Sequence, residues 1–342
     1  MKDIYPNNRL SSSFERKVYK TLMHVIDGKH RMLLACSAGI DSTALLVLMT
    51  RCYSKNNIEV AYFDHRTRSN RAHQEEYDFL LEVCNNLGVK IHRGVLSKKI
   101  KKQSEEALRL ARYQWLSTLC RQEAIQYIVT GHHLNDQAET LLFRLARGTS
   151  LDGIQSMQML SELNDEMILN KKMSSRSSSI FLLRPLLGFP KKDLKGYLDS
   201  LGIEAISDPS NHDIGYSRNL IRKKVLPSLE CINPKAIHAI TKFALIAKKD
   251  DDALLFFAKE NYSEIVTEYN TAVKIDIETL NKLPNAIMIR IIILSCRHLS
   301  VSINSDQIQH IIDLKDKNRS IYSLSKAEVR TNKKVITIKQ LI

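Results

Sequence analysis

Asp136 and Glu139 are the two residues whose types and spacing point most directly to chemistry. We expect a helix from about residue 135 to 147, and side chains three residues apart share a helix face. Both carboxylates would therefore lie side by side near the first helical turn, an arrangement that suits a positively charged amino group. The simpler interpretation is that Asp136 only interacts favourably with the helix dipole and that Glu139 is solvated.

A second candidate is a segment of mostly small residues between an apolar run and a run of good helix formers. It comprises Ser37, Ala38, Gly39, Ile40, Asp41 and Ser42. The order strand, tight loop, helix allows backbone N–H groups and hydroxyls to close on a phosphate at the positive end of the helix. The spacing matches neither the Walker loop nor the dinucleotide pattern G-x-G-x-x-G. An ordinary strand-to-helix turn capped by Ser42 is the alternative interpretation.

Two histidines and two arginines complete the candidate set. His132 and His133 are adjacent, so their side chains diverge, and no cysteine cluster accompanies them to form a zinc site. We assign no metal ligands, and expect His132 to line a nucleotide pocket while His133 packs or bonds locally. Arg109 and Arg112 share one helix face, which is also compatible with a solvated stripe.

Strands alternate with helices over the part of the chain that carries these residues. The predicted strands are 32–36, 58–63, 89–96, 127–130 and 181–187. The predicted helices include 71–86, 104–125, 135–147 and 191–201. Gly88 closes the first of these helices, Ser104 caps the second and Gly148 ends the third. Short connections between alternating elements imply an α/β fold with a doubly wound parallel sheet covered on both faces. Ligands bind beyond the carboxyl ends of such strands, where Ser37, Asp64 and His132 would converge.

We divide the chain into a lead-in helix within residues 1–30, an α/β domain over 31–215 and a smaller α+β domain over 216–342. The serine-rich run Met173–Ser179 indicates an exposed, mobile loop, and residues 208–211 indicate a turn near the end of the α/β domain. Beyond it, helices are expected over 237–261 and 284–299, followed by strand-like alternation over 321–338.

Composition narrows the function classes. The formal net charge is +14, and residues 216–342 hold 21 Lys and Arg against 13 Asp and Glu, which suits a polyanionic partner or a basic, soluble surface. The six cysteines include no C-x-x-C pair, so neither a disulfide framework nor a metal site is indicated. No apolar stretch is long enough to span a bilayer and no signal core opens the chain, so we expect a soluble, unexported protein.

Several segments together resemble the tRNA(Ile)-lysidine synthetases of the pyrophosphatase-loop (PP-loop) group. Residues 37–42 resemble the loop Ser-Gly-Gly-x-Asp-Ser, with Ala38 in place of the first Gly. The matching segments are Thr130–Thr140 (T-G-H-H-x-x-D-Q-A-E-T), Arg109–Tyr113 (R-x-x-R-Y), Asp64–His65, Arg184–Leu187 (R-P-L-L), Asp208–Asn211 (D-P-S-N) and Arg218–Arg222 (R-N-x-x-R). If the loop needs a positive φ at residue 38, Ala is strained; if it needs only a small side chain, Ala fits.

The resemblance implies a ligase that uses ATP, with Mg²⁺, and free L-lysine to modify tRNA(Ile) bearing a CAU anticodon. The wobble cytosine would attack the α-phosphate of ATP and release pyrophosphate, and the ε-amino group of lysine would then displace AMP to form lysidine. Residues 37–42 and His132 would bind ATP, and Arg109 and Arg112 would face nucleotide or tRNA phosphates. Asp136 and Glu139 would position the lysine, and one of them or Asp41 would accept its proton.

Two other functions share these features. A PP-loop tRNA thiolation enzyme would use the same adenylating loop but needs cysteines in paired spacing, which this chain lacks. A catalytically inactive RNA-binding relative is supported by Ala38. The resemblance together with the charge implies that residues 216–342 bind tRNA, and the expected location is the cytoplasm, or an organelle stroma if the gene is organellar. The oligomeric state is left open, with a homodimer among the options.

Overall fold

The computed structural model describes residues 10–67, 69–96, 105–154, 157–163, 179–206, 217–315, 317 and 319–341. Two compact units emerge from it. Unit 1 contains residues 1–143 and 156–241, and unit 2 contains residues 144–155 and 242–342. Residues 173–178 of the serine-rich loop predicted over 173–179, the turn at 208–211 and the Ser104 cap lie outside the described residues. Among the described residues, no helix combines the length and the apolar composition needed to cross a membrane.

Unit 1 is built around a six-stranded sheet. Its elements are α1 (Ser13–Met23), β1 (Met32–Cys36), α2 (Ile40–Cys52), η2 (Lys55–Asn57), β2 (Ile58–Asp64), α3 (Asn70–Leu87), β3 (Lys90–Val95), α4 (Glu105–Gln122), β4 (Tyr127–Thr130), α5 (Leu134–Ala146), β5 (Leu160–Glu162), β6 (Phe181–Leu183), α8 (Lys191–Ser200), α9 (Ser217–Leu220), the π-helical turn η4 (Ile221–Val225), α10 (Leu226–Ile232) and α11 (Ala236–Ile265). The strand order is β3-β2-β1-β4-β6-β5, and the first five strands in that order pair in parallel.

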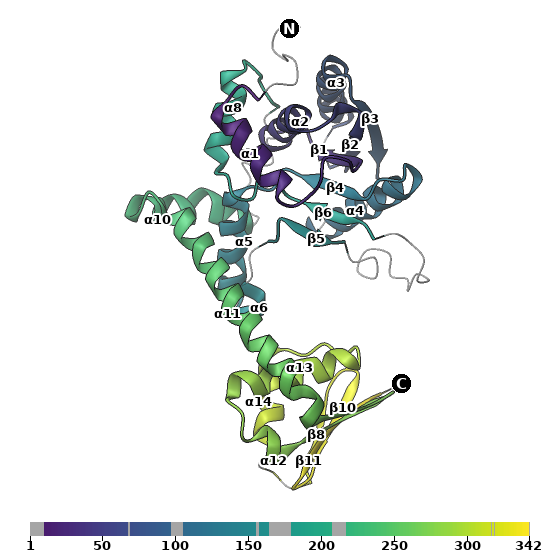
Figure 1. Ribbon diagram of the computed structural model, residues 1–342, viewed down its shortest axis with the longest axis vertical. Helices are drawn as coiled ribbons and strands as arrows, with labels where there is room; N and C mark the ends of the chain where they lie inside the picture. Colours follow the sequence, from purple (N-terminus) through teal and green to yellow (C-terminus); the bar gives the residue numbers. More distant parts are fainter. Residues whose placement is uncertain are drawn as a thin grey trace. The chain divides into compact units, whose positions relative to one another are not determined.

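Helices cover both faces of this sheet (Figure 1). One core unites buried residues of α1, α2, α3 and α8 with β1 and β2, and a second core joins α4 to the opposite face. Helix α2 is buried along its whole length from Ser42 to Cys52, as its run of apolar residues requires. The predicted doubly wound parallel sheet is therefore confirmed.

Two details of the sheet differ from the sequence-based expectation. The strand predicted over 181–187 ends at Leu183, since Pro185 has no N–H group to continue the ladder. Strand β5 was not predicted; it pairs antiparallel with β6 at the sheet edge and is only three residues long. A three-residue edge strand has too short an apolar pattern to be recognised in a sequence.

A buried ion pair joins the helices that cover one face. Glu15 of α1 is fully buried and accepts a hydrogen bond from the Tyr197 hydroxyl of α8 at 2.8 Å. It also pairs with Arg51 of α2 and accepts from the Ser12 N–H at 3.0 Å, within the capping box that starts α1. Burial alone would raise the pKa of Glu15, but these hydrogen bonds and the Arg51 charge lower it to about 2.

Unit 2 contains an antiparallel sheet with strand order β7-β8-β11-β10-β9. Its elements are α6 (Leu151–Ile154), β7 (Val266–Tyr269), β8 (Ala272–Asp276), α12 (Ile277–Leu280), α13 (Asn285–His298), α14 (Ser305–Leu314), β9 (Ile321–Ser323), β10 (Ala327–Thr331) and β11 (Val335–Gln340). The buried faces of α13, α14 and the sheet form one core. The predicted α+β character of this region is confirmed, and the break at Asn332-Lys333 is the turn between β10 and β11.

The chain passes between the units three times: within α5, between residues 155 and 156, and within α11. The last three residues of α5 and the greater part of α11 therefore belong to unit 2. Residues 216–241 cluster with unit 1, whereas the sequence-based division began the second domain at residue 216. The reason is local packing: Ile221, Leu226 and Ile237 form a small core with Leu134 and Ala138 of α5. The functional meaning of the division at 216 stays a prediction.

Candidate active site

The loop 37–42 after β1, which we call the candidate phosphate loop, contains a residue in the left-handed region. Ala38 has a φ of +61°. Of the two possibilities for this position, a positive φ or merely a small side chain, the positive φ therefore applies. A side chain in this left-handed region costs about 1–2 kcal/mol. The surroundings impose this geometry, since the Ala38 carbonyl accepts from the Ile206 N–H at 3.0 Å and the Thr43 hydroxyl at 3.3 Å. The methyl group itself is fully buried.

The first turn of α2 begins without a side-chain cap. Its N-cap is Gly39, which offers no side-chain cap, so Ser42 is not the capping residue that the simpler interpretation required. The Ser42 hydroxyl instead accepts from the Ser37 N–H at 3.1 Å and donates to the Gly39 carbonyl at 3.0 Å. Unused N–H groups at a helix start are a ready anion site.

The end of β4 lies directly against this turn. A Cβ atom on Gly131 would lie 2.9 Å from the carbonyl oxygen of Asp41, so only glycine permits this approach. The next residues then reach the loop: the buried His133 places Nε2 3.4 Å from the Asp41 carboxylate and Nδ1 3.3 Å from the Asp136 carboxylate. His133 therefore lies between the candidate phosphate loop and the acidic pair. Sequence reasoning expected this residue to pack or bond locally, as it does with Asp136, but did not foresee its contact with Asp41.

The two carboxylates beside His133 differ in their electrostatics. Burial raises the pKa of Asp136, and the nearby Glu139 and Asp41 charges add to the rise, against the opposing effect of His133. Burial acts on Asp41 in the same direction, but His133 and the Lys191 ammonium, 3.2 Å away, outweigh it and lower the pKa of Asp41. Asp136 thus holds a proton more readily than Asp41 does.

Glu139 is engaged by an arginine from further along the chain. Its carboxylate accepts two hydrogen bonds from Arg222, Nε to Oε1 at 2.8 Å and Nη2 to Oε2 at 2.7 Å. Arg222 also lies 3.7 Å from Asp136 and comes from the π-helical turn η4. The R-N-x-x-R motif contained this residue, but nothing in the sequence indicated its partner.

His132 lies in a positively charged environment. Burial and the charges of Arg184, Arg109 and Arg112 lower the pKa of His132 to about 3, so its imidazole is neutral at physiological pH. Its Nδ1 lies 2.7 Å from the Thr130 hydroxyl. Arg184 is buried, and its Nε atom has no hydrogen-bond partner among the described residues. These three arginines form a candidate anion site, to which sequence reasoning assigned only Arg109 and Arg112.

A cavity of about 130 Å³ lies at the carboxyl ends of β1 and β2. Ser37 of the candidate phosphate loop and Arg112 of α4 both line it, together with Tyr62, His65 and Glu76. The His65 Nδ1 atom is buried without a hydrogen-bond partner among the described residues, and burial with the Arg112 charge lowers the pKa of His65 to about 4. The rim predicted from the strand ends therefore contains both the candidate phosphate loop and an adjoining pocket.

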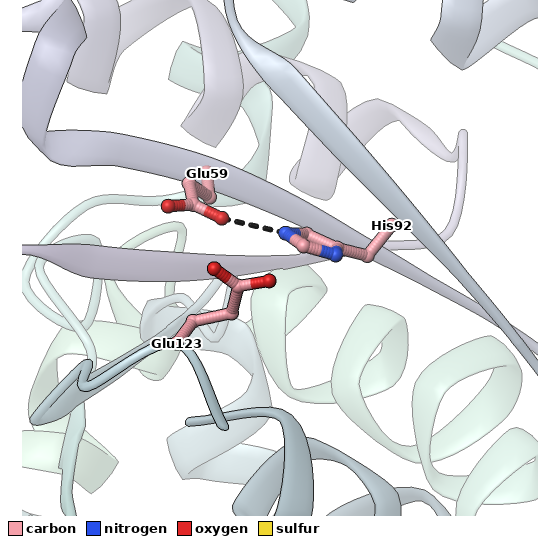
Figure 2. Close-up of side chains that lie close together, drawn as sticks. All are labelled: Glu59, His92 and Glu123. Carbon is pink, nitrogen blue, oxygen red and sulfur yellow. Dashed lines mark hydrogen bonds and ion pairs between the residues drawn. The ribbon is translucent and has the colours of Figure 1, made fainter. Parts of the chain in front are cut away.

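One group of three side chains in the described part of the chain has the geometry of a metal site. Glu59, His92 and Glu123 place their ligand atoms within 4.8 Å of one another (Figure 2). Glu59 and His92 lie near the amino ends of β2 and β3, and Glu123 follows the end of α4. Lys90 lies 3.5 Å from Glu59 and 3.1 Å from Glu123, and Arg31 also pairs with Glu59. Since these cations already offset both carboxylates, the group is best explained as an ion network at the sheet edge opposite the candidate phosphate loop.

The structure thus brings most of the predicted site residues together. Asp136 and Glu139 form one cluster with Asp41, which belongs to the loop 37–42. His132 lies close to Arg109 and Arg112. Residues outside the predicted set are Gly131, His133, Arg184, Lys191 and Arg222. The roles of all these residues are treated as proposals below.

Fold and site together define an α/β protein whose β1–α2 loop, the candidate phosphate loop, lies at the carboxyl edge of a parallel sheet. The family model described as a PP-loop domain matches residues 10–229, and the chain belongs to this family.

Curated relatives within this family are tRNA(Ile)-lysidine synthases. That of Pseudothermotoga lettingae is 29% identical over 323 residues, covering 91% of this chain and 66% of the relative. That of a Nostoc species is 32% identical over 243 residues, covering 70% of this chain and 66% of the relative. The resemblance seen in the motifs is thereby confirmed, although the chain spans just under two thirds of the length of these relatives.

A solved structure shares the fold. The U34-tRNA thiolase NcsA from Methanococcus maripaludis, determined with its [4Fe-4S] cluster, aligns with a TM-score of 0.53 over 68% of this chain and 78% of its own, at 16% identity. At this identity the likeness concerns the fold alone.

Proposed function

We propose that this protein is a tRNA(Ile)-lysidine synthase, a ligase that joins L-lysine to C2 of the wobble cytidine of tRNA(Ile) with a CAU anticodon. The observation that carries the proposal is His133, whose two ring nitrogens lie within 3.4 Å of Asp41 in the candidate phosphate loop and of Asp136 in the acidic pair. An ATP-activated intermediate and an incoming amine would therefore meet at one place.

ATP would bind with its phosphates at the loop 37–42 and the start of α2. The adjoining cavity, lined by Ser37 and Arg112, would accept part of the nucleotide. Mg²⁺ fits this site, because the Asp41 Oδ1 atom is a buried carboxylate oxygen without a hydrogen-bond partner among the described residues. A magnesium ion held there by Asp41 would offset charge on the pyrophosphate as it leaves.

Lysine would bind at the acidic cluster. Its ε-amino group is protonated at neutral pH, with a reference pKa of about 10.4, so a neighbouring group must accept a proton before nitrogen attacks. Asp136, Glu139 and Asp41 are the carboxylates available in the described part of the site. Glu139 is buried, whereas the Asp136 and Asp41 side chains are 20% and 31% exposed, so an ammonium group from solvent can reach these two carboxylates.

The tRNA would approach through positive charge. Arg109 and Arg112 form no ion pair with a carboxylate among the described residues and are suited to phosphate oxygens. Arg184 is buried and already donates from Nη1 to the Gln158 carbonyl at 2.7 Å and to the Ser161 hydroxyl at 3.1 Å, so it contributes mainly its charge. We also propose, from its charge, that the region 216–342 binds tRNA and that 31–215 is the ATP-binding catalytic domain. Affinity for tRNA should then fall steeply with salt concentration, while a flat response would contradict this assignment.

The proposal is tested with purified protein, ATP, labelled lysine and tRNA(Ile) carrying CAU, followed by nucleoside analysis. We expect lysidine, together with pyrophosphate release that depends on the tRNA. A matched tRNA with uridine at the wobble position serves as the control and should give neither product. Asp136→Asn and Glu139→Gln should both lower lysine incorporation, and normal rates in both variants would refute the assignment of the acidic pair.

The same assay separates the other functions. A thiolation enzyme would introduce sulfur in place of lysine, but none of the six cysteines belongs to a candidate metal group among the described residues. An inactive RNA-binding relative would bind tRNA without releasing pyrophosphate. Its main support, Ala38, is weakened because the loop adopts the left-handed conformation in spite of the alanine side chain.

A further inference from the structure

Arg222 binds the carboxylate of Glu139, one of the two that were expected to hold the substrate amine. Both oxygens of Glu139 accept a hydrogen bond from its guanidinium, and the Glu139 side chain is only 5% exposed. Arg222 itself is 34% exposed, but the bidentate pair is costly to break, because separation leaves the buried Glu139 charge uncompensated. The amine would therefore meet this site with Arg222 in place.

The charges around the amine site come from four elements. They are Asp41 on α2, Asp136 and Glu139 on α5, Lys191 on α8 and Arg222 on η4, with the His133 ring between Asp41 and Asp136. Lys191 offsets Asp41 and Arg222 offsets Glu139, so Asp136 is the carboxylate without a close cationic partner of its own; its contact with Arg222 is 3.7 Å long. Among the side chains themselves, without the magnesium ion proposed at Asp41, one negative charge is left over, and one ammonium group would offset it.

The position of Arg222 also resolves a conflict in the chemistry. Carboxylates hold an ammonium group well, but they raise its pKa and so delay loss of its proton. A guanidinium beside the same site acts in the opposite direction, since a like charge disfavours the protonated amine.

We propose that Arg222 is a positioning residue for the amine: it keeps Glu139 neutralised, so that the ammonium faces Asp136 and gives its proton to that carboxylate. In this step one proton moves from the ammonium nitrogen to an Asp136 oxygen, and the nitrogen retains the electron pair for attack. The inference rests on the proposed function and sharpens it, because it assigns different roles to Asp136 and Glu139. The raised pKa of Asp136 agrees with its role as acceptor.

The test measures kcat and KM for lysine from pH 6 to 10 in wild type, Arg222→Gln, Glu139→Gln and the double variant. Arg222→Gln leaves Glu139 uncompensated, so we expect a lower KM for lysine but about tenfold lower kcat at pH 7, with the pH profile moved about one unit upward. The double variant removes both charges and should recover kcat and the pH profile to within about threefold of wild type. Arg222→Lys, which retains the charge, should leave the pH profile in place.

Lys192→Gln on α8 is the matched control, because it removes one exposed positive charge from the same unit. Its pH profile should equal that of wild type. A role in folding alone would lower kcat in Arg222→Gln without moving the pH profile, and would overturn the inference.

Two further results would also overturn it. Effects of the single variants that simply multiply in the double variant would show that Glu139 and Arg222 act independently. A lower KM with an unchanged pH profile would show that lysine displaces Arg222. If wild type releases pyrophosphate and forms no lysidine, the proposed function fails, and the inference fails with it for that separate reason.

Discussion

The ion pair between α1 and α2 allows a quantitative prediction about unit 1. Glu15 is fully buried, pairs with Arg51 and accepts a hydrogen bond from Tyr197 at 2.8 Å. Glu15→Gln retains the shape of the side chain but removes its charge, so Arg51 loses this ion pair inside the core. Removing one partner of a buried pair costs about 3–5 kcal/mol.

The pKa of Glu15 gives an independent magnitude. A carboxyl pKa lowered from 4.5 to about 2 corresponds to about 3 kcal/mol of stability at neutral pH. Because the folded-state pKa is the lower one, this stability is present above pH 4.5 and is lost as the pH falls towards 2. The difference in unfolding free energy between wild type and Glu15→Gln should shrink over that interval.

The assay is urea unfolding followed by tryptophan fluorescence. Trp115, on α4 of unit 1, is the only tryptophan and lies 5.4 Å from the Phe63 ring, so its signal reports unit 1 specifically. Glu82→Gln on α3 changes an exposed glutamate and should alter the free energy of unfolding by less than about 0.5 kcal/mol. A loss below about 1 kcal/mol for Glu15→Gln, or a difference that stays constant from pH 7 to pH 2.5, would refute the reasoning.

Three further predictions concern the site and the surface. Gly131→Ala should lower tRNA-dependent pyrophosphate release at least about tenfold, since its Cβ would displace the Asp41 backbone; a normal rate would contradict the close approach. In urea unfolding, Ala38→Val should lower the free energy of unfolding of unit 1 by about 2–4 kcal/mol, because residue 38 has a positive φ. Ala38→Gly should change it by no more than about 1 kcal/mol, because relief of backbone strain and loss of a buried methyl group oppose each other. A thiol reagent should modify about one cysteine, Cys231, in the folded protein and all six after unfolding, and rapid reaction of a second thiol would place another cysteine at the surface.

Local pattern was enough to predict most of the fold. The apolar run of β1, the periodicity of α3 and the left-handed Gly88 that ends it depend on neighbours in the chain, and the structure contains each of them. Strand β5 depends instead on pairing with β6 about twenty residues later, so its short sequence carried no clear pattern.

The sequence by itself determined which chemical groups are present and that strand ends would bring them to one rim, because the carboxyl ends of parallel strands lie on the same edge. Only the tertiary structure decided how those groups pair. Arg222 lies 83 residues from Glu139 and Lys191 lies 150 residues from Asp41, so no local pattern could join them. The charge that each carboxylate presents to a substrate depends on these partners and on burial, and both arise only when the chain is folded.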